Sequence, residues 1–138
     1  RVLFRSGLAQ VAGLAKRFPK VNIILDHFAR PDTTDGPPYR NAVSLFALAA
    51  FENIYLKISP PIIGRMSKAP SDTTTFMTRV IAAYGANRIA WGSNFPTSPG
   101  SMADHLAQAR KVLEPFSDED REWIFARTAQ TLYPSLKD

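Results

Sequence analysis

Val21-Asn22-Ile23-Ile24-Leu25-Asp26-His27 is a short apolar run with β-branched residues that ends in an acid and an imidazole. The pattern is typical of a buried parallel strand with polar residues at its carboxyl end. Residues 53–59 and 88–93 have a similar character and also end in polar residues. We therefore predict three short strands, and each should present polar side chains where it ends.

Stretches with helical periodicity separate these strands. We expect helices over residues 6–18, 40–51, 72–84, 101–113 and 117–132, with Ser6 capping the first and Ser71 or Asp72 the third. Strands that alternate with helices at this spacing imply right-handed crossovers and a parallel sheet. The sequence thus predicts an α/β fold, with residues 1–138 forming one domain.

Side-chain patterns predict three local details. In the second helix, an Ala- and Leu-rich stretch, the expected buried residues are Val43, Phe46, Ala47 and Ala50. Pro60-Pro61 should end the second strand and start a loop through Gly64 and Pro70. Strand alternation should send Asp26 to the face opposite His27, towards the helices.

Composition narrows the class of protein. The chain has 138 residues, 45% of them hydrophobic, and no cysteine, which rules out disulfides and thiolate chemistry and favours a cytoplasmic location. No apolar run approaches the roughly 20 residues that cross a bilayer, so we expect no membrane association. The net charge of +5 is spread over single residues and pairs without a nucleic-acid-binding motif, so nucleic acid is not an expected partner.

In parallel α/β folds, ligands bind beyond the carboxyl ends of the strands, which directs attention to His27, Ser59 and Asn94. Imidazole can act as a base, hydrogen-bond a carbonyl or bind a metal, although a histidine satisfied within the packing is the alternative for His27. His105 lies within a predicted helix, where a surface or packing role is expected.

Lys57 shares a strand face with Tyr55 and Ser59. If the other face packs against helices and the parallel sheet closes into a barrel, Lys57 points into the barrel. It then needs an anion or a substrate carboxylate as a partner. The alternative is an edge strand with Lys57 in water. Two histidines without an HxH or HExxH pair cannot supply three zinc ligands unless carboxylates are recruited, so we assign no metal ligand.

Four segments in this order resemble the amidohydrolase-related family of TIM-barrel hydrolases, in its lactonase and decarboxylase branch. They are residues 18–27, 53–59, 84–96 and 124–133, and they span nearly the whole chain. The resemblance implies the C-terminal portion of a (β/α)₈ barrel, with parallel strands six to eight and flanking helices.

By that resemblance His27 is the strand-six histidine, which orients or deprotonates the hydrolytic water or polarises the substrate carbonyl. Asn94 occupies the strand-eight position where the family usually has an aspartate, and an amide cannot serve as a base. The family's HxH and strand-five histidine would lie upstream, so the chain looks like a truncated product or a cropped half. A divalent metal such as zinc belongs to the full-length family, with its ligands largely missing here, and the cofactor is left unknown.

The resemblance therefore implies a hydrolase acting on a small cyclic ester, amide or related carboxylate through activated water, with this portion inactive alone. The expected catalytic residues are His27 and Asn94, and the expected substrate-binding residues are Lys57, Ser59 and Arg30. One alternative is a non-oxidative decarboxylase in which Lys57 or Arg30 holds the carboxylate. Another is a non-catalytic half-barrel for binding or assembly. The expected partner is a small-molecule substrate, with a homo-oligomer left open.

Overall fold

The computed structural model describes residues 2–68 and 72–137, with side chains from residue 7 onward. Its centre is a parallel sheet in the order β1-β2-β3, formed by Ile23–Asp26, Ile54–Ile58 and Ile89–Trp91. The predicted parallel pairing is confirmed, and each strand is shorter than predicted. β1 starts at Ile23 because that residue aligns with Ile54, the first residue of its partner strand.

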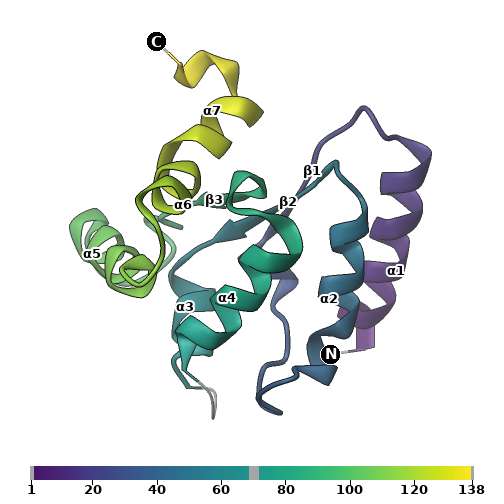
Figure 1. Cartoon of the computed structure of the whole chain (residues 1–138), viewed down its shortest axis with the longest axis horizontal. Helices are drawn as coiled ribbons and strands as arrows, with labels where there is room; N and C mark the ends of the chain where they lie inside the picture. The colour runs from purple at the N-terminus through teal and green to yellow at the C-terminus, as the bar shows by residue number, and fades with distance from the viewer. Residues whose placement is uncertain (1, 69–71, 138) are drawn as a thin grey trace.

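Helices flank the strands in the predicted order. Figure 1 shows α1 and α2 next to each other at one end of the molecule and α5 at the other, with the strands between them. The α-helices are α1 (Val2–Arg17), α2 (Val43–Ala47), α3 (Pro60–Met66), α4 (Thr73–Tyr84), α5 (Met102–Leu113), α6 (Asp118–Glu122) and α7 (Thr128–Leu132). A π-helical turn, Trp123–Arg127, joins α6 to α7, and 3₁₀ turns cover His27–Ala29, Arg40–Ala42, Leu48–Ala50, Ala86–Arg88 and Pro134–Leu136.

The two faces of the sheet differ in burial. Ile54, Leu56 and Ile58 of β2 are fully buried in the core beneath the helices, whereas Tyr55 and Lys57 are partly exposed. The register aligns Asp26 with Lys57, so both side chains lie on the less covered face. The prediction that Asp26 faces the helices was wrong. It took His27 as part of the extended strand, but the backbone leaves that conformation at His27.

The segment after β2 corrects a second prediction. Pro60 begins α3 instead of a loop, because proline suits the first turn of a helix, where its missing N–H leaves no bond unmade. Ile62, Ile63 and Met66 then fall on its buried side. The end of the predicted loop, Pro70, lies outside the described residues.

The buried side of the second helix was also predicted wrongly. Ala42, Leu45 and Leu48 are buried, whereas Val43 is 62% exposed and Ala47 and Ala50 are exposed. The segment carries a 3₁₀ turn at each end of α2, and in a 3₁₀ helix the same side recurs every third residue. Of the predicted set only Phe46 packs partly against the core.

Helix ends agree with the prediction in most places. Asp72 caps α4 by accepting a hydrogen bond from the Thr75 N–H at 2.6 Å, and Ser101 and Ser117 cap α5 and α6. The predicted cap Ser71 lies outside the described residues. The first helix starts at Val2, upstream of Ser6, so the prediction of a cap at Ser6 was wrong.

Side chains at the amino edge of the sheet tie its helices together. The Asn53 amide donates to the carbonyls of Ala15, Phe18 and Val21 at 2.9 to 3.3 Å, which closes the turn from α1 into β1. The buried Tyr84 hydroxyl donates to the Leu45 carbonyl at 2.6 Å, linking α4 to α2. Asn53 and Tyr84 come shortly before β2 and β3, so these bonds lie away from the carboxyl ends of the strands. Among the described residues, no helix combines the length and apolarity needed to cross a membrane.

Candidate active site

A left-handed turn follows β1 directly. His27, Phe28, Ala29 and Arg30 have φ values of 53 to 55°, and the Arg30 N–H donates to the His27 carbonyl at 2.8 Å. A non-glycine residue in this conformation costs about 1–2 kcal/mol, so the surrounding structure must hold the turn. Phe28 is fully buried in the core and anchors it. Backbone strain of this kind concentrates at functional sites.

The turn brings His27 to Ser59, at the end of the neighbouring strand. His27 Nδ1 lies 2.6 Å from Ser59 Oγ, and the Ser59 side chain is fully buried. Partial burial lowers the pKa of His27 below its ordinary 6.5, and the positive charges of Lys57 and Arg30 act in the same direction, although the Asp26 carboxylate opposes them. His27 is therefore a neutral imidazole near pH 7, with Nδ1 engaged by the serine.

Lys57 and Asp26 form an ion pair beside this contact. Lys57 Nζ lies 2.6 Å from Asp26 Oδ1, and both side chains are partly exposed. Gly92, next to β3, makes room for the lysine, because a Cβ added there would lie 2.9 Å from Lys57 Cδ. Asp26 of the same chain thus supplies the anion that we expected for Lys57 if it pointed inward, although both side chains are partly exposed.

Asn94 lies beyond the end of β3. It also has a left-handed backbone, with φ of 54°, which asparagine tolerates better than most residues. Its amide nitrogen donates to Ser98 Oγ at 2.8 Å. Asn94 and His27 are at the same edge of the sheet, but β2 separates their strands. No contact between them is seen in the described part of the chain, so a pocket shared by the two stays a prediction.

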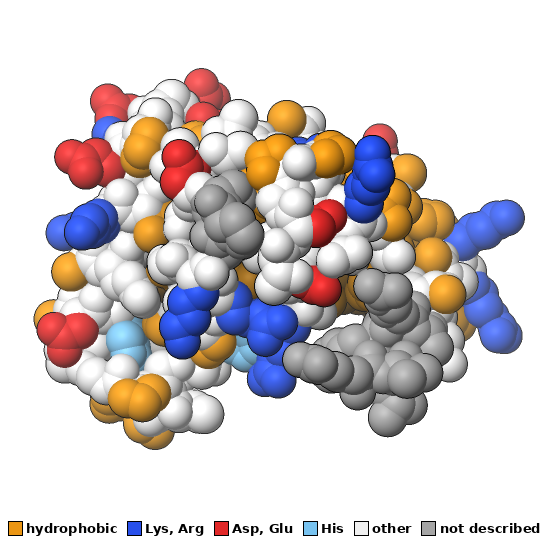
Figure 2. Space-filling view, turned by 90° about the horizontal axis from the view of Figure 1, so that it is seen from below, with side chains coloured by type: hydrophobic (Ala, Val, Ile, Leu, Met, Phe, Trp, Pro, Cys, Tyr) orange, Lys and Arg blue, Asp and Glu red, His pale blue; other side chains and the backbone are white. Residues whose placement is uncertain are grey.

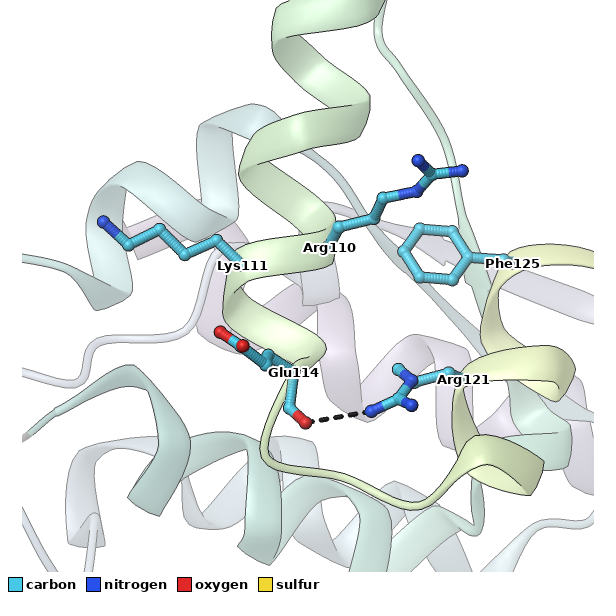
Figure 3. Close-up of a pocket in the computed structure, with 5 residues that line it drawn as sticks. All are labelled: Arg110, Lys111, Glu114, Arg121 and Phe125. Atoms are coloured by element: carbon cyan, nitrogen blue, oxygen red, sulfur yellow. Dashed lines mark hydrogen bonds between the residues drawn. The ribbon is translucent and has the colours of Figure 1, made fainter.

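The described residues line cavities in the helices and loops around the sheet, two of which bear on the candidate site. One, of about 470 Å³, lies between α5 and the segment from α6 into the π-helical turn (Figure 3). Its lining residues are Arg110, Lys111, Glu114, Arg121 and Phe125. The other, of about 150 Å³, is lined by residues 31–34, which follow the left-handed turn, and by Arg65 and Lys68. Neither cavity is lined by His27 or Asn94, so the first belongs to the helical layer and only the second adjoins the candidate site.

Positively charged side chains surround His27 and the smaller cavity. Figure 2 shows the face seen from below, where Lys and Arg side chains cluster near its middle with histidine beside them. The exposed Arg30 is one of the charges that act on His27, and Arg65 and Lys68 line the smaller cavity. A cationic rim of this kind attracts anionic groups such as carboxylates.

The second histidine, His105, packs within a helix away from the candidate site. His105 is buried in α5, and its Nε2 lies 2.9 Å from the Pro99 carbonyl oxygen, so of the two expected roles, surface or packing, the structure shows packing. Across residues 2–68 and 72–137, no three His, Cys, Asp or Glu side chains are close enough together to hold a metal. The described His, Asp and Glu residues therefore do not form a metal site by themselves.

The model of the amidohydrolase family Amidohydro_2 matches residues 3–135. The chain belongs to this family. It is 29% identical over 137 residues to the L-fucono-1,5-lactonase of Burkholderia ambifaria, covering 91% of this chain and 46% of the relative. It is 32% identical over 126 residues to an uncharacterized protein of Sinorhizobium fredii, covering 87% of this chain and 41% of that protein. The chain thus spans less than half the length of these relatives.

Solved structures agree with the predicted fold. An amidohydrolase from Burkholderia multivorans with bound HEPES has a TM-score of 0.73 at 21% identity, over 92% of this chain and 49% of that one. A putative 2-pyrone-4,6-dicarboxylic acid hydrolase from Pseudomonas putida has a TM-score of 0.70 at 25% identity, over 95% and 50%. The predicted family and the predicted fold, part of a (β/α)₈ barrel, are confirmed. The roles predicted for individual site residues stay predictions.

Proposed function

We propose that the protein that contains this chain hydrolyses a small cyclic ester and that His27 assists at the ester carbonyl. The observation that supports this most directly is the imidazole that Ser59 holds at the carboxyl edge of the sheet, where partial burial lowers its pKa. The names of two similar proteins add support, since a 1,5-lactone and a 2-pyrone are both six-membered ring esters.

In the proposed reaction a water oxygen attacks the carbonyl carbon, which becomes tetrahedral, and the electron pair of the C=O π bond moves to the carbonyl oxygen to give an oxyanion. Collapse of this intermediate breaks the ring C–O bond, and the proton given up by the attacking water ends on the leaving ring oxygen, giving a hydroxy acid. His27 Nε2 is the ring nitrogen not engaged by Ser59, so it is available to the substrate or the water. The Asn94 amide can orient either by hydrogen bonds but cannot take a proton from water.

The charges around the turn favour a lactone that also carries a carboxylate. Arg30 is exposed beside His27, and Arg65 and Lys68 line the adjoining cavity. Lys57 already pairs with Asp26, so Arg30 is the stronger candidate for holding a substrate carboxylate. The decarboxylase alternative would use Arg30 for the same purpose, so the reaction product distinguishes the two functions.

The test compares hydrolysis of a carboxylated 1,5-lactone with that of its uncharged analogue. It uses the native gene product, with whatever sequence flanks residues 1–138. We expect kcat/KM to be higher for the carboxylated lactone, and Arg30→Ala should reduce that preference. Lys111→Ala, an exposed change in α5, serves as the control. Release of CO₂ without ring opening would favour the decarboxylase instead.

A further inference from the structure

The Ser59 hydroxyl does not form the hydrogen bond that is usual at its position in the chain. It precedes α3 in the N-cap position, where a serine hydroxyl commonly accepts a bond from a backbone N–H of the first turn. Ser59 makes no side-chain cap bond, and its Oγ lies 2.6 Å from His27 Nδ1 instead. The backbone carbonyl of Ser59 still accepts the Ile62 and Ile63 N–H groups at 3.1 Å, so the helix starts without help from the hydroxyl.

The burial of Ser59 indicates whether its hydroxyl or His27 Nδ1 donates the hydrogen bond between them. The Ser59 side chain is fully buried, so its hydroxyl proton cannot bond to bulk water. His27 Nδ1 is the partner found for Ser59 Oγ among the described residues. If Nδ1 carried a proton and donated it, the serine proton would remain buried without an acceptor, which costs more than an unused oxygen lone pair.

We propose that Ser59 is a positioning residue that donates its hydroxyl proton to Nδ1 and fixes His27 as the Nε2–H tautomer. The imidazole then presents an N–H, not a lone pair, at its free nitrogen. It can donate a hydrogen bond to the substrate carbonyl oxygen and to the oxyanion that follows, and in this form it cannot take a proton from water at Nε2. The catalytic meaning of this tautomer rests on the proposed function, but the tautomer itself does not.

The location of the proton can be measured without a substrate. We expect ¹⁵N NMR of the histidine-labelled protein above pH 7.5 to show His27 protonated at Nε2 and bare at Nδ1. In Ser59→Ala the ratio of the two tautomers should fall by about fivefold, as loss of one ordinary hydrogen bond predicts. The pKa of His27 should rise, because the serine bond favours the neutral ring.

Two further variants separate this effect from general damage. Ser59→Thr keeps the hydroxyl and should keep the tautomer, whereas Ser67→Ala removes a hydroxyl from the other end of α3 and should leave the His27 spectrum unchanged. Wild-type His27 protonated at Nδ1, or a pKa of His27 that falls in Ser59→Ala, overturns the proposal. An Nε2–H tautomer in a protein that hydrolyses no lactone would reject the proposed function and leave the positioning role intact.

Discussion

Lys57 Nζ lies 2.6 Å from Asp26 Oδ1, and the two residues occupy aligned positions of β1 and β2. The pair therefore follows directly from strand register. It lies on the partly exposed face of the sheet, where an ion pair contributes roughly 1 kcal/mol or less to stability. Both members of the pair also act on His27, where Asp26 opposes the lowering of the imidazole pKa by burial and Lys57 adds to it.

The contact between Gly92 and Lys57 can be tested with a double-mutant cycle. Gly92→Ala places a methyl group 2.9 Å from Lys57 Cδ and should displace the lysine. We expect Lys57→Ala to remove this clash, so the double variant should lose less free energy of unfolding than the two single losses added together. Urea titrations of the three variants measure this, and strictly additive losses would show that the two residues do not touch.

The lowered pKa of His27 has a consequence for stability. The charged imidazole is disfavoured in the folded state, so its contribution is fully present above the unfolded pKa of about 6.5 and is lost as the pH falls below that value. The free energy of unfolding of the wild type should therefore fall more between pH 7.5 and pH 5.5 than that of His27→Gln. Equal slopes for the two proteins would mean that His27 titrates as in the unfolded chain.

The left-handed turn predicts a stabilising substitution. Ala29 has φ of 55°, so Ala29→Gly should raise the free energy of unfolding by about 1 kcal/mol through relief of strain. The same exchange at Ala82, an exposed position in α4, should lower it by roughly 0.5–1 kcal/mol. Opposite signs in chemical denaturation support the turn, and a loss of stability at both positions argues against it.

The hydrogen bond from Tyr84 joins two helices at the edge away from the site. Burial raises the pKa of the Tyr84 phenol, so the hydroxyl stays protonated and donates to the Leu45 carbonyl. Tyr84→Phe should cost about 1–2 kcal/mol of stability with turnover preserved in the folded fraction. Tyr133→Phe, at a residue that is 52% exposed, is the matched control and should change stability by less than about 0.5 kcal/mol. Similar losses of unfolding free energy in the two variants would show that the Tyr84 hydrogen bond does not stabilise the protein.

The sequence predicts strands better than it predicts what happens at their ends. Apolar runs such as Ile23 to Leu25 predict a parallel strand, although only Leu25 of the three is buried. The buried Phe76, Met77, Val80 and Tyr84 follow from helical period. The start of α3 escaped prediction because Pro60-Pro61 suits a loop and a first helical turn equally well.

The parts of the candidate site that escaped prediction depend on geometry that no local pattern encodes. Residues 27–30 contain no glycine, so the sequence does not predict a left-handed turn there. The His27–Ser59 bond joins residues 32 positions apart, and it needs both that turn and the burial of the serine. The Asp26–Lys57 pair could have been found by aligning the apolar positions of the two strands, since register alone fixes it.

The most direct test of the central claim is the turnover of a 1,5-lactone by the native gene product and by its His27→Ala variant, each checked for folding by circular dichroism. Loss of a positioned hydrogen-bonding imidazole should lower kcat/KM by about 10²–10⁴-fold, with the secondary structure unchanged. A folded variant that hydrolyses the lactone within about threefold of the wild-type rate would contradict a role for His27 at the carbonyl.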